Sequence, residues 1–577
     1  MNNARPLLDR SAAGIGLVIV VAANLVYLAG LPLILDPMIS MEPFYIHMAQ
    51  LPLSSILSTD AAWGPLYALW LKPFVVALGD PLAVYAANLY FLSAGVSLLV
   101  YLDVLLLTRR AAAATGAALF FLICDLNVPL FNKVSGFALM VVLAGLTVSE
   151  LLPAGARRMT AVSVGVLLAS YARPELYPAA LVLSLNSFWL GWKGAGAIGR
   201  SVLLWPTAGL ALIAILALGA GSPALGSSQS SGRLLMAFRE HFAWNWGRWH
   251  NGWSDLFSVW QQEFGSAQSL FEAFLNNPRV FVHHLTDNLL GVASFMTTTA
   301  FDHYPLLVPA TRPGLVKAES LLVAVAACGS LILVAARPRL RRQMLDRYGH
   351  VLLPYAWLAI PSLAGATLVF PQAYYLVIPG VLLMLAATLA LTLIVPTRPV
   401  FSARTRVLAA LACLMAVPKP FVLPSAYLVD GSPFKADIAV ARTVTDTVAF
   451  IRCLRLAAPV HVLTFTDGIG EMLGPGFEEV KLWEKGEQPL EAYLRDNDVA
   501  MIVSLKHGQE GFVGSDPYWH VLKYTPDAAG FTRLSVPDHE PVVLYVRTDR
   551  LEKRGESMQN QPATSGAPCE RFHSSIR

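Results

Sequence analysis

Long apolar segments are the feature that most constrains what this chain can fold into. Its 577 residues include several apolar runs of about 18 to 22 residues, each long enough to cross a hydrocarbon core as a helix. Charged residues make up only 14% of the chain, whereas a soluble protein carries roughly a quarter. The sequence therefore predicts an α-helical polytopic membrane protein embedded in a lipid bilayer. Its net charge is only +4, and its lysines and arginines form no basic stripe. Both observations argue against a nucleic-acid partner.

About eleven transmembrane helices are expected from the apolar runs and the polar breaks between them. Arginine and lysine gather in alternate loops, most densely over Arg337–Arg347, and such loops stay in the cytoplasm. We therefore expect a multi-pass protein of a bacterial inner membrane, with a cytoplasmic N-terminus and large outer loops at 36–80 and 221–315. The spans and these loops together form a predicted membrane domain over 1–424. The spans are placed near 12–35, 82–107, 111–124, 134–152, a fifth ending near 173, 176–192, 201–220, 316–336, 351–370, 374–395 and 407–423.

The last third of the chain has the pattern of a soluble α/β domain. We expect a small periplasmic α/β sandwich over 425–550, followed by a disordered tail at 551–577. The predicted helices lie at 438–455 and 490–495, and the predicted strands at 461–465, 480–483, 499–504, 531–535 and 542–547.

The first outer loop, 36–80, is too long and too rich in aromatic residues and carboxylates to be a passive connection. Carboxylates held at a membrane surface are costly, so Asp36 and Glu42 are candidate catalytic residues. For Glu42 the alternative is a structural carboxylate at the first turn of a helix over 43–50. The candidate substrate-binding residues of this loop are Tyr45, His47, Trp63 and Tyr67.

Three cations near the predicted outer boundary run against the expected charge distribution, and each is a candidate ligand for a lipid phosphate. They are Lys72, Lys133 and Arg173. Arg173 precedes Pro174, which ends an apolar stretch, and a guanidinium suits the bidentate geometry of phosphate. The alternative for Arg173 is a local ion pair with Glu175.

Aromatic residues of the second outer loop recur at steps of three and four from Trp246 to Phe264. The pattern predicts one face of a single amphipathic helix. Two explanations are open: a helix resting at the depth of the lipid headgroups, or a stacking wall for a sugar ring or a lipid. The histidines of the loop lack ligand-like spacing, so polar or interfacial packing is expected of them.

No cofactor and no metal site are expected. The five cysteines show neither C-x-x-C nor His-paired spacing, so neither a zinc site nor a disulfide framework is indicated. Asp496 and Asp498 have the D-x-D form that can hold a divalent cation, but these residues also favour a turn. Gly468 and Gly470 follow a predicted strand, and their spacing favours a turn over a nucleotide-binding loop.

In layout and motifs the chain resembles the C-type (GT-C) integral-membrane glycosyltransferases, near the aminoarabinose transferase and protein mannosyltransferase branch. Those enzymes begin with one span and an outer loop that opens with Asp-Glu, followed by an aromatic residue and an alanine. Glu42, Tyr45 and Ala49 match that pattern, whereas Met41 replaces the first acidic residue. The stretch 63–67 is similar to the family's Pro-Leu stretch before the second span.

The resemblance implies an inverting glycosyltransferase that moves a sugar from a polyprenyl-phosphate donor to an envelope glycan, lipid or protein acceptor at the outer face. Such a reaction needs a carboxylate to deprotonate the acceptor hydroxyl and a cation to stabilise the departing phosphate. Glu42 and Arg173 would fill these roles, and Gln372 stands where many relatives carry an arginine before a tyrosine. The alternative is a non-catalytic glycan-assembly or flippase-like membrane protein on the same scaffold. A secondary transporter is disfavoured, because the halves of the chain show no paired broken helices.

Overall fold

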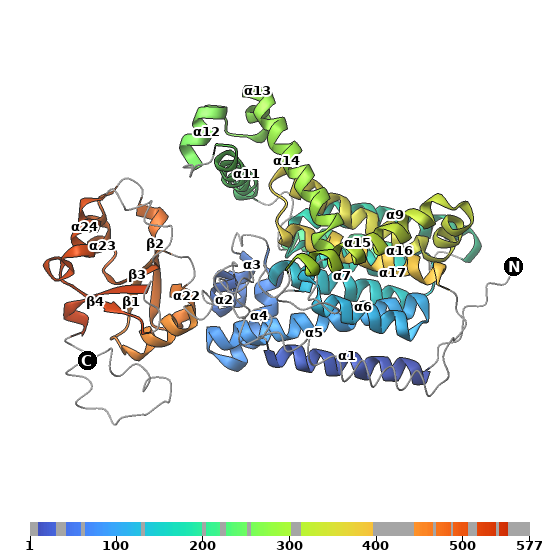
Figure 1. Ribbon diagram of the computed structural model, residues 1–577, viewed down its shortest axis with the longest axis horizontal. Helices are drawn as coiled ribbons and strands as arrows, with labels where there is room; N and C mark the ends of the chain where they lie inside the picture. Colours follow the sequence, from blue (N-terminus) through green and yellow to red (C-terminus); the bar gives the residue numbers. More distant parts are fainter. Residues whose placement is uncertain are drawn as a thin grey trace. The chain divides into compact units, whose positions relative to one another are not determined.

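The computed structural model describes residues 10–30, 42–58, 64–127, 133–198, 204–219, 227–250, 256–301, 313–395, 444–465, 469–485, 488–505, 516–537 and 542–551 (Figure 1). Asp36, Trp63, the predicted span at 407–423 and the predicted domain boundary near residue 424 lie outside them. The chain divides into two compact units. Unit 1 comprises Met1–Gly30, Leu53–Tyr67 and Tyr90–Ala426, and unit 2 comprises Leu31–Pro52, Ala68–Leu89 and Tyr427–Arg577.

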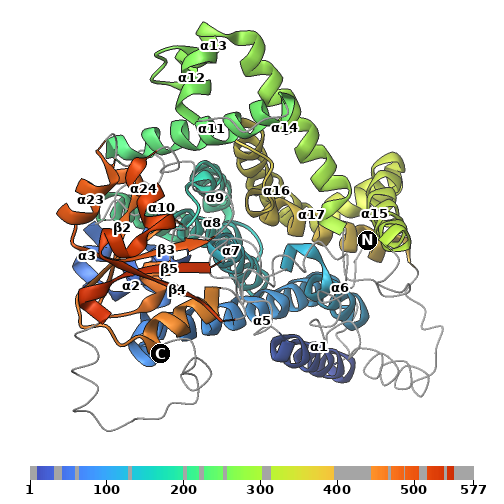
Figure 2. The same ribbon diagram turned by 60° about the vertical axis from the view of Figure 1, so that its left-hand side comes forward.

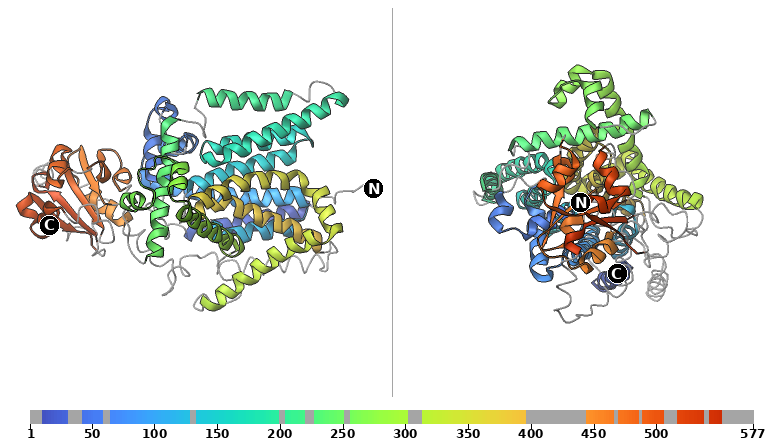
Figure 3. Two further views of the ribbon diagram at one scale, coloured as in Figure 1. Left: turned by 90° about the horizontal axis from the view of Figure 1, so that it is seen from above. Right: turned by 90° about the vertical axis from the view of Figure 1, so that its left-hand side faces the viewer.

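Apolar helices that run side by side form most of unit 1 (Figure 3, left). Within the described residues, six helices are long and apolar enough to cross a membrane. The helical membrane protein predicted from the sequence is therefore confirmed. The six are α1 (Arg10–Gly30), α5 (Pro81–Thr108), α7 (Lys133–Leu151), α15 (Pro313–Ala336), α16 (Pro338–Leu368) and α17 (Ala373–Ile394), and the other bundle helices are α6 (Ala111–Ile123), α8 (Ala156–Ser170), α9 (Tyr177–Ile198) and α10 (Leu204–Gly219).

After its first residue, the N-cap Arg337, the basic segment 337–347 is helical, although the sequence analysis placed it in a loop. It forms the first turns of α16, with Pro338 at the first helical position. Proline is favoured there because its missing N–H needs no partner, and arginine is a good helix former. The predicted span near 351–370 is thus the second part of a longer helix.

Small residues let α7, α8 and α9 approach closely. Gly145 and Gly165 face each other, and a Cβ at Gly145 would lie only 3.1 Å from the Cα of Gly165. The hydroxyls of Thr160 and Ser187 are 2.6 Å apart, which joins α8 to α9. Close backbone contact and interhelical hydroxyl bonds are the usual means of helix association in lipid.

The second outer loop of unit 1 contains helices α11 to α14 (Figure 2). Aromatic side chains form a buried core among them. The predicted single amphipathic helix is wrong, because α11 ends at Trp249 and α12 begins at Leu256. Trp260 and Phe264 are buried against Phe238 and Phe242, so they pack inward and form no exposed stacking wall. The helices are α11 (Ser227–Trp249), α12 (Leu256–Phe264), α13 (Leu270–Asn276) and α14 (Pro278–Thr297).

The C-terminal part of unit 2 is the predicted α/β domain. Its five strands lie in the order β2-β1-β3-β5-β4, with β1 parallel to β2 and β3, and β5 antiparallel to β3 and β4. Trp519 of α24, a helix that the sequence analysis missed, is buried in the core. The elements are β1 (Val460–Thr464), α22 (Ile469–Leu473), β2 (Phe477–Lys481), α23 (Leu490–Asp496), β3 (Val499–Leu505), α24 (Pro517–Tyr524), β4 (Phe531–Ser535) and β5 (Val542–Arg547).

Parts of the first outer loop belong to the same unit as this domain. Helix α2 (Glu42–Gln50) packs against α22. Between α4 (Leu66–Leu78) and α5, the carboxylate of Asp80 accepts a hydrogen bond of 2.8 Å from Arg452, which also donates to the carbonyls of Met472 and Leu473. The C-terminal domain therefore holds the helix that carries Glu42.

Cys453 lies in a helix over 444–453 and is disulfide-bonded. The sequence analysis indicated no disulfide framework, and this is a correction. Cysteine spacing reports on local motifs, whereas a disulfide depends on whether two cysteines meet in space.

Candidate functional site

Arg173 occupies a sharp corner between two helices of unit 1. Helix α8 ends at Ser170, and Pro174 begins a short 3₁₀ turn, η3 (Pro174–Leu176), so Arg173 itself has an extended backbone. Its side chain is only 2% exposed. Nε donates a hydrogen bond of 2.7 Å to Oε1 of Glu175, so the ion pair considered in the sequence analysis is present.

The second amino group of the Arg173 guanidinium, Nη2, makes no hydrogen bond within the described structure. Nη2 lies 2.6 Å from the same carboxylate oxygen but without hydrogen-bond geometry, and it is buried with no hydrogen-bond partner within the described structure. The guanidinium carbon lies 4.8 Å from the ring centre of Tyr375 and 5.6 Å from that of Tyr374. Burial disfavours the charge, but Glu175 and the tyrosines outweigh it, so the pKa of Arg173 is raised.

Gly64 brings the first outer loop of unit 1 against the same corner. Its φ of +104° is a conformation that other residues rarely adopt, and a Cβ there would overlap the carbonyl oxygen of Tyr171. The N–H of Leu66 donates to that oxygen over 3.3 Å. Tyr67, a predicted substrate-binding residue, is buried with its ring 5.4 Å from Phe137. The stretch that resembles the family's Pro-Leu motif therefore packs beside the turn that carries Arg173.

A buried amide–imidazole network ties α11 and α14 to the end of α16. Nδ2 of Asn245 donates to Oδ1 of Asn288 and to Nδ1 of His284, each over 3.0 Å. Nδ2 of Asn288 donates to the carbonyls of Thr367 and Val369. Nε2 of His284 lies 3.1 Å from the Val369 carbonyl, which only accepts, so we assign the proton to Nε2. Burial lowers the pKa of His284 to about 4, so this imidazole is neutral.

The network positions the connection between α16 and α17. Phe370 stacks on His241 of α11, with ring centres 5.2 Å apart, and Trp244 meets Phe370 edge-on. His241 is buried, its Nδ1 has no hydrogen-bond partner in the described structure, and burial lowers its pKa to about 4. Oε1 of Gln372, the residue that precedes α17, is buried and equally unpartnered there.

Glu240 precedes His241 on α11 and interacts electrostatically with Tyr374 and Tyr375. Its side chain is exposed, yet surrounding protein desolvates it and raises its pKa. Water therefore reaches the carboxylate while protein encloses it on other sides. Sequence reasoning missed Glu240, Asn245 and Asn288, whose only signal was their position on helical segments of a long outer loop.

The other predicted residues of the first loop lie in unit 2. Glu42 is the first residue of α2 and is fully buried. Tyr45 is buried and packs edge-on against Phe44, whereas His47 is exposed. The position of Glu42 fits the structural explanation, and its burial in a first helical turn is also compatible with the catalytic one.

The two predicted lysine ligands differ. Nζ of Lys72 donates to the carbonyls of Ala49 and Leu51 over 2.9 and 2.6 Å, which satisfies acceptors at the C-terminal end of α2. Lys133 is the first residue of α7, and its side chain lies outside the described part. A phosphate-binding role for either remains a prediction.

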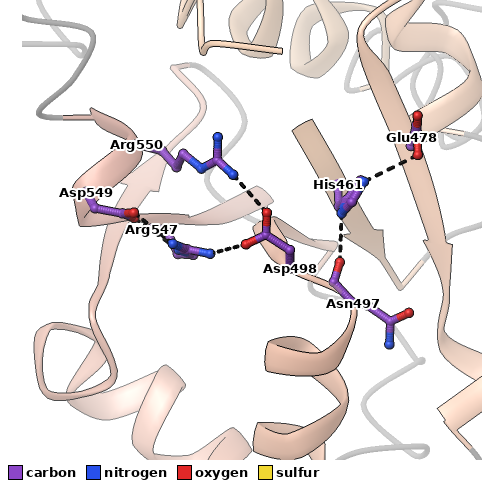
Figure 4. A network of polar contacts seen from close by, with 7 residues as sticks. All are labelled: His461, Glu478, Asn497, Asp498, Arg547, Asp549 and Arg550. Atoms are coloured by element: carbon purple, nitrogen blue, oxygen red, sulfur yellow. Dashed lines mark hydrogen bonds and ion pairs between the residues drawn. The ribbon is translucent and has the colours of Figure 1, made fainter. Parts of the chain in front are cut away.

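The D-x-D sequence ends in a turn at residues 497–498. Figure 4 shows the contacts of its second aspartate, Asp498. Asp498 has a φ of +44°, and its carboxylate accepts hydrogen bonds from Arg547 and Arg550. The Asn497 carbonyl lies 2.7 Å from Nδ1 of His461. The carboxylate of Asp498 is thus occupied by guanidinium groups, which supports the turn explanation over a divalent-cation site.

No protein-family model matches the chain, and no curated protein is similar to it. Among solved structures, the chain is similar to the archaeal oligosaccharyltransferase AglB from Archaeoglobus fulgidus in complex with an inhibitory peptide and a dolichol-phosphate. The match has a TM-score of 0.40 and 12% sequence identity, and it covers 95% of this chain and 75% of that chain.

Proposed function

We propose that the chain is a glycosyltransferase that moves a sugar from a polyprenyl-phosphate donor to a glycan, lipid or protein acceptor. The observation that carries the proposal is Arg173. Its guanidinium is buried, charged and only partly hydrogen-bonded, at a corner between apolar helices. Buried cations in membrane proteins mark functional sites by default. A polyprenyl chain would hold its phosphate at the membrane surface, where such a cation can bind it.

The hydrogen-bond donors of the Arg173 guanidinium suit the phosphate that departs in such a reaction. A guanidinium carries five N–H donors, and Arg173 gives one hydrogen bond to Glu175. The remaining donors suit the oxygens of a phosphate, whose negative charge grows as the sugar departs. Arg173 also lies over the tyrosine pair that follows Gln372, where the family resemblance leads one to expect an arginine. In this proposal the guanidinium comes from the α8–α9 corner instead.

We place this reaction on the outer face of a bacterial inner membrane. The disulfide at Cys453 supports that side, because disulfides persist in oxidising compartments such as the periplasm. The charge distribution along the chain supports it as well.

Glu42 is the proposed general base of the transfer. The test is Glu42→Gln, which retains size and an acceptor oxygen but cannot take up the acceptor's proton. We expect sugar transfer from a purified polyprenyl-phosphate donor to fall by about a hundredfold or more, with the unfolding temperature near that of the wild type. Undiminished transfer would exclude Glu42 as the base and make Asp36 the next candidate.

The Arg173–Glu175 ion pair favours the alternative, a non-catalytic glycan-assembly or flippase-like protein. A guanidinium already neutralised by its neighbour serves packing without any substrate. The two functions separate in one assay with the wild-type protein. The assay contains labelled donor and an envelope extract as the source of acceptor. Transfer of the labelled sugar to the extract, with release of free polyprenyl phosphate, supports the enzyme, and donor binding without transfer supports the alternative.

A further inference from the structure

We propose that α11 and the α16–α17 connection bind the sugar of the lipid-linked donor, with Gln372, His241 and Glu240 as the side chains that hold its hydroxyls. This inference rests on the proposed function, because Arg173 binds the phosphate of the same donor. All of these residues belong to unit 1.

The α16–α17 connection and the first residues of α17, together 369–375, relate the three side chains to Arg173. His241 stacks on Phe370, and two residues further along the chain is Gln372. Tyr374 and Tyr375 follow, their ring centres 4.4 Å apart, with the Arg173 guanidinium over them. The sequence of groups is thus imidazole, phenyl ring, amide, tyrosine pair and guanidinium. Such a series suits a sugar phosphate, because the C–H faces of a sugar pack on aromatic rings.

Three buried polar atoms of this set have no hydrogen-bond partner within the described residues. They are Nδ1 of His241, Oε1 of Gln372 and Nη2 of Arg173, and they come from three separate segments. Each buried unsatisfied group costs about 1 to 3 kcal/mol, so native structures keep few of them without a reason. All three belong to, or lie against, one short segment, residues 370–375, which indicates a ligand that supplies their partners.

The chemistry of the atoms selects the ligand. Oε1 of Gln372 and the carboxylate of Glu240 accept hydrogen bonds, which the hydroxyls of a sugar donate. His241 adds a neutral imidazole, since burial lowers its pKa to about 4. A uronic acid would place its own carboxylate near that of Glu240, so like charges would repel. The occupant is therefore a sugar without a carboxylate.

The site is held in place before any ligand arrives. The Asn245–His284–Asn288 network fixes the carbonyl of Val369, the residue before Phe370. Trp244 supports the other edge of the Phe370 ring. Preorganised side chains lose little entropy on binding, which favours selective recognition of a small polar group.

Binding of short lipid analogues to the purified protein tests the inference. The probes are bare farnesyl phosphate and farnesyl phosphates that carry glucose, arabinose or glucuronate. In the wild type we expect glucose or arabinose to bind about tenfold more tightly than the bare phosphate, and glucuronate to gain nothing. Gln372→Met and Glu240→Met, which remove the acceptor oxygens, should each lose most of the gain and leave the affinity for bare farnesyl phosphate unchanged. Gln262→Met, at an exposed position of α12, is the matched control and should keep the gain.

Two outcomes would overturn the sugar site while leaving the phosphate site intact. One is equal affinity of the wild type for the bare and all sugar-bearing phosphates. The other is an equal loss for bare and sugar-bearing phosphates in Gln372→Met, which would indicate a structural role for the amide. Failure of the wild type to bind any of the four lipids would instead refute the proposed function, and the sugar site with it.

Discussion

The two ends of α8 carry buried charges that are arranged in opposite ways. Near its start, Oε1 of Glu150 lies 3.3 Å from Nη1 of Arg158 and 2.9 Å from Nε2 of His350, so one carboxylate serves two basic side chains from α8 and α16. Beyond its end, Arg173 has a single carboxylate and a buried Nη2 with no hydrogen bond within the described structure. The first arrangement ties helices together, and the second keeps binding capacity for a further anion.

The largest effect is expected at the start of α8. Glu150→Gln leaves Arg158 buried without its carboxylate, and removing one partner of a buried pair costs about 3 to 5 kcal/mol of unfolding free energy. Denaturation in detergent measures this loss. Sugar transfer per folded molecule should remain at the wild-type level, because the network binds no substrate. A stable variant that fails to transfer sugar would contradict the comparison.

Counted per side chain, the next largest effect is that of acid on two buried histidines, His241 of α11 and His284 of α14. The pKa of His241 and that of His284 are lowered to about 4 by burial, from an ordinary 6.5. Between pH 6.5 and 4 the unfolded chain binds more protons than the folded one, so stability is complete above 6.5 and falls as the pH drops towards 4. The full loss is about 3 kcal/mol for each histidine.

The unfolding midpoint measured from pH 7 to pH 4 checks this slope. His241→Phe keeps a ring on Phe370 but removes one titrating group, so the slope should fall by about half. Replacement of Gln262, which is exposed and carries no titrating group, is the matched control and should leave the slope unchanged. An unaltered slope in His241→Phe would show that this histidine does not titrate as described.

Arg173 itself is expected to affect function more than stability. Arg173→Ala should reduce sugar transfer by about a hundredfold, equivalent to roughly 2.7 kcal/mol, because the departing phosphate loses its cation. Arg173→Lys should retain part of the donor affinity, since lysine keeps the charge without the planar fork. Arg158→Lys tests the same change at the opposite end of α8. Equal donor binding by wild type, Arg173→Lys and Arg173→Ala would leave only the ion pair with Glu175.

Exposed charges provide the smallest effect in the series. Asp498 of unit 2 pairs with Arg547 and Arg550 near solvent. Asp498→Asn removes the charge while retaining a residue that tolerates a φ of +44°, and it should cost less than about 1 kcal/mol. Chemical denaturation measures it, and a loss comparable to that of Glu150→Gln would erase the distinction between buried and exposed pairs.

Local patterns accounted for most of the fold. Apolar runs predicted the bundle, and alternating strands predicted β4 and β5 to the residue. The single Trp-rich helix failed because a three-and-four spacing cannot show that a helix ends at Trp249. The basic segment of α16 failed because charge marks the cytoplasmic side but does not break a helix.

The candidate site was harder to predict from the sequence than the fold, because its contacts join distant segments. Arg173 and its neighbour Glu175 were visible together in sequence, and so was their ion pair. Asn288 contacts Val369, 81 residues away, and Gly64 contacts Tyr171, about a hundred residues away. Both contacts depend on the packing of segments that are distant in the sequence. Pattern reasoning has no access to such pairs. The roles of Glu42, Tyr45 and His47 stay predictions.

Gly64 has a consequence for tracing the ancestry of this protein. Its backbone rests against the Tyr171 carbonyl with no room for a side chain, so selection can replace it only by remodelling the corner that carries Arg173. A descendant that retains this corner must retain the glycine, even if every nearby side chain has drifted. Glycine before Pro-Leu, together with an Arg-Pro turn farther along, is therefore a two-part signature with which distant relatives can be recognised when overall sequence similarity has vanished.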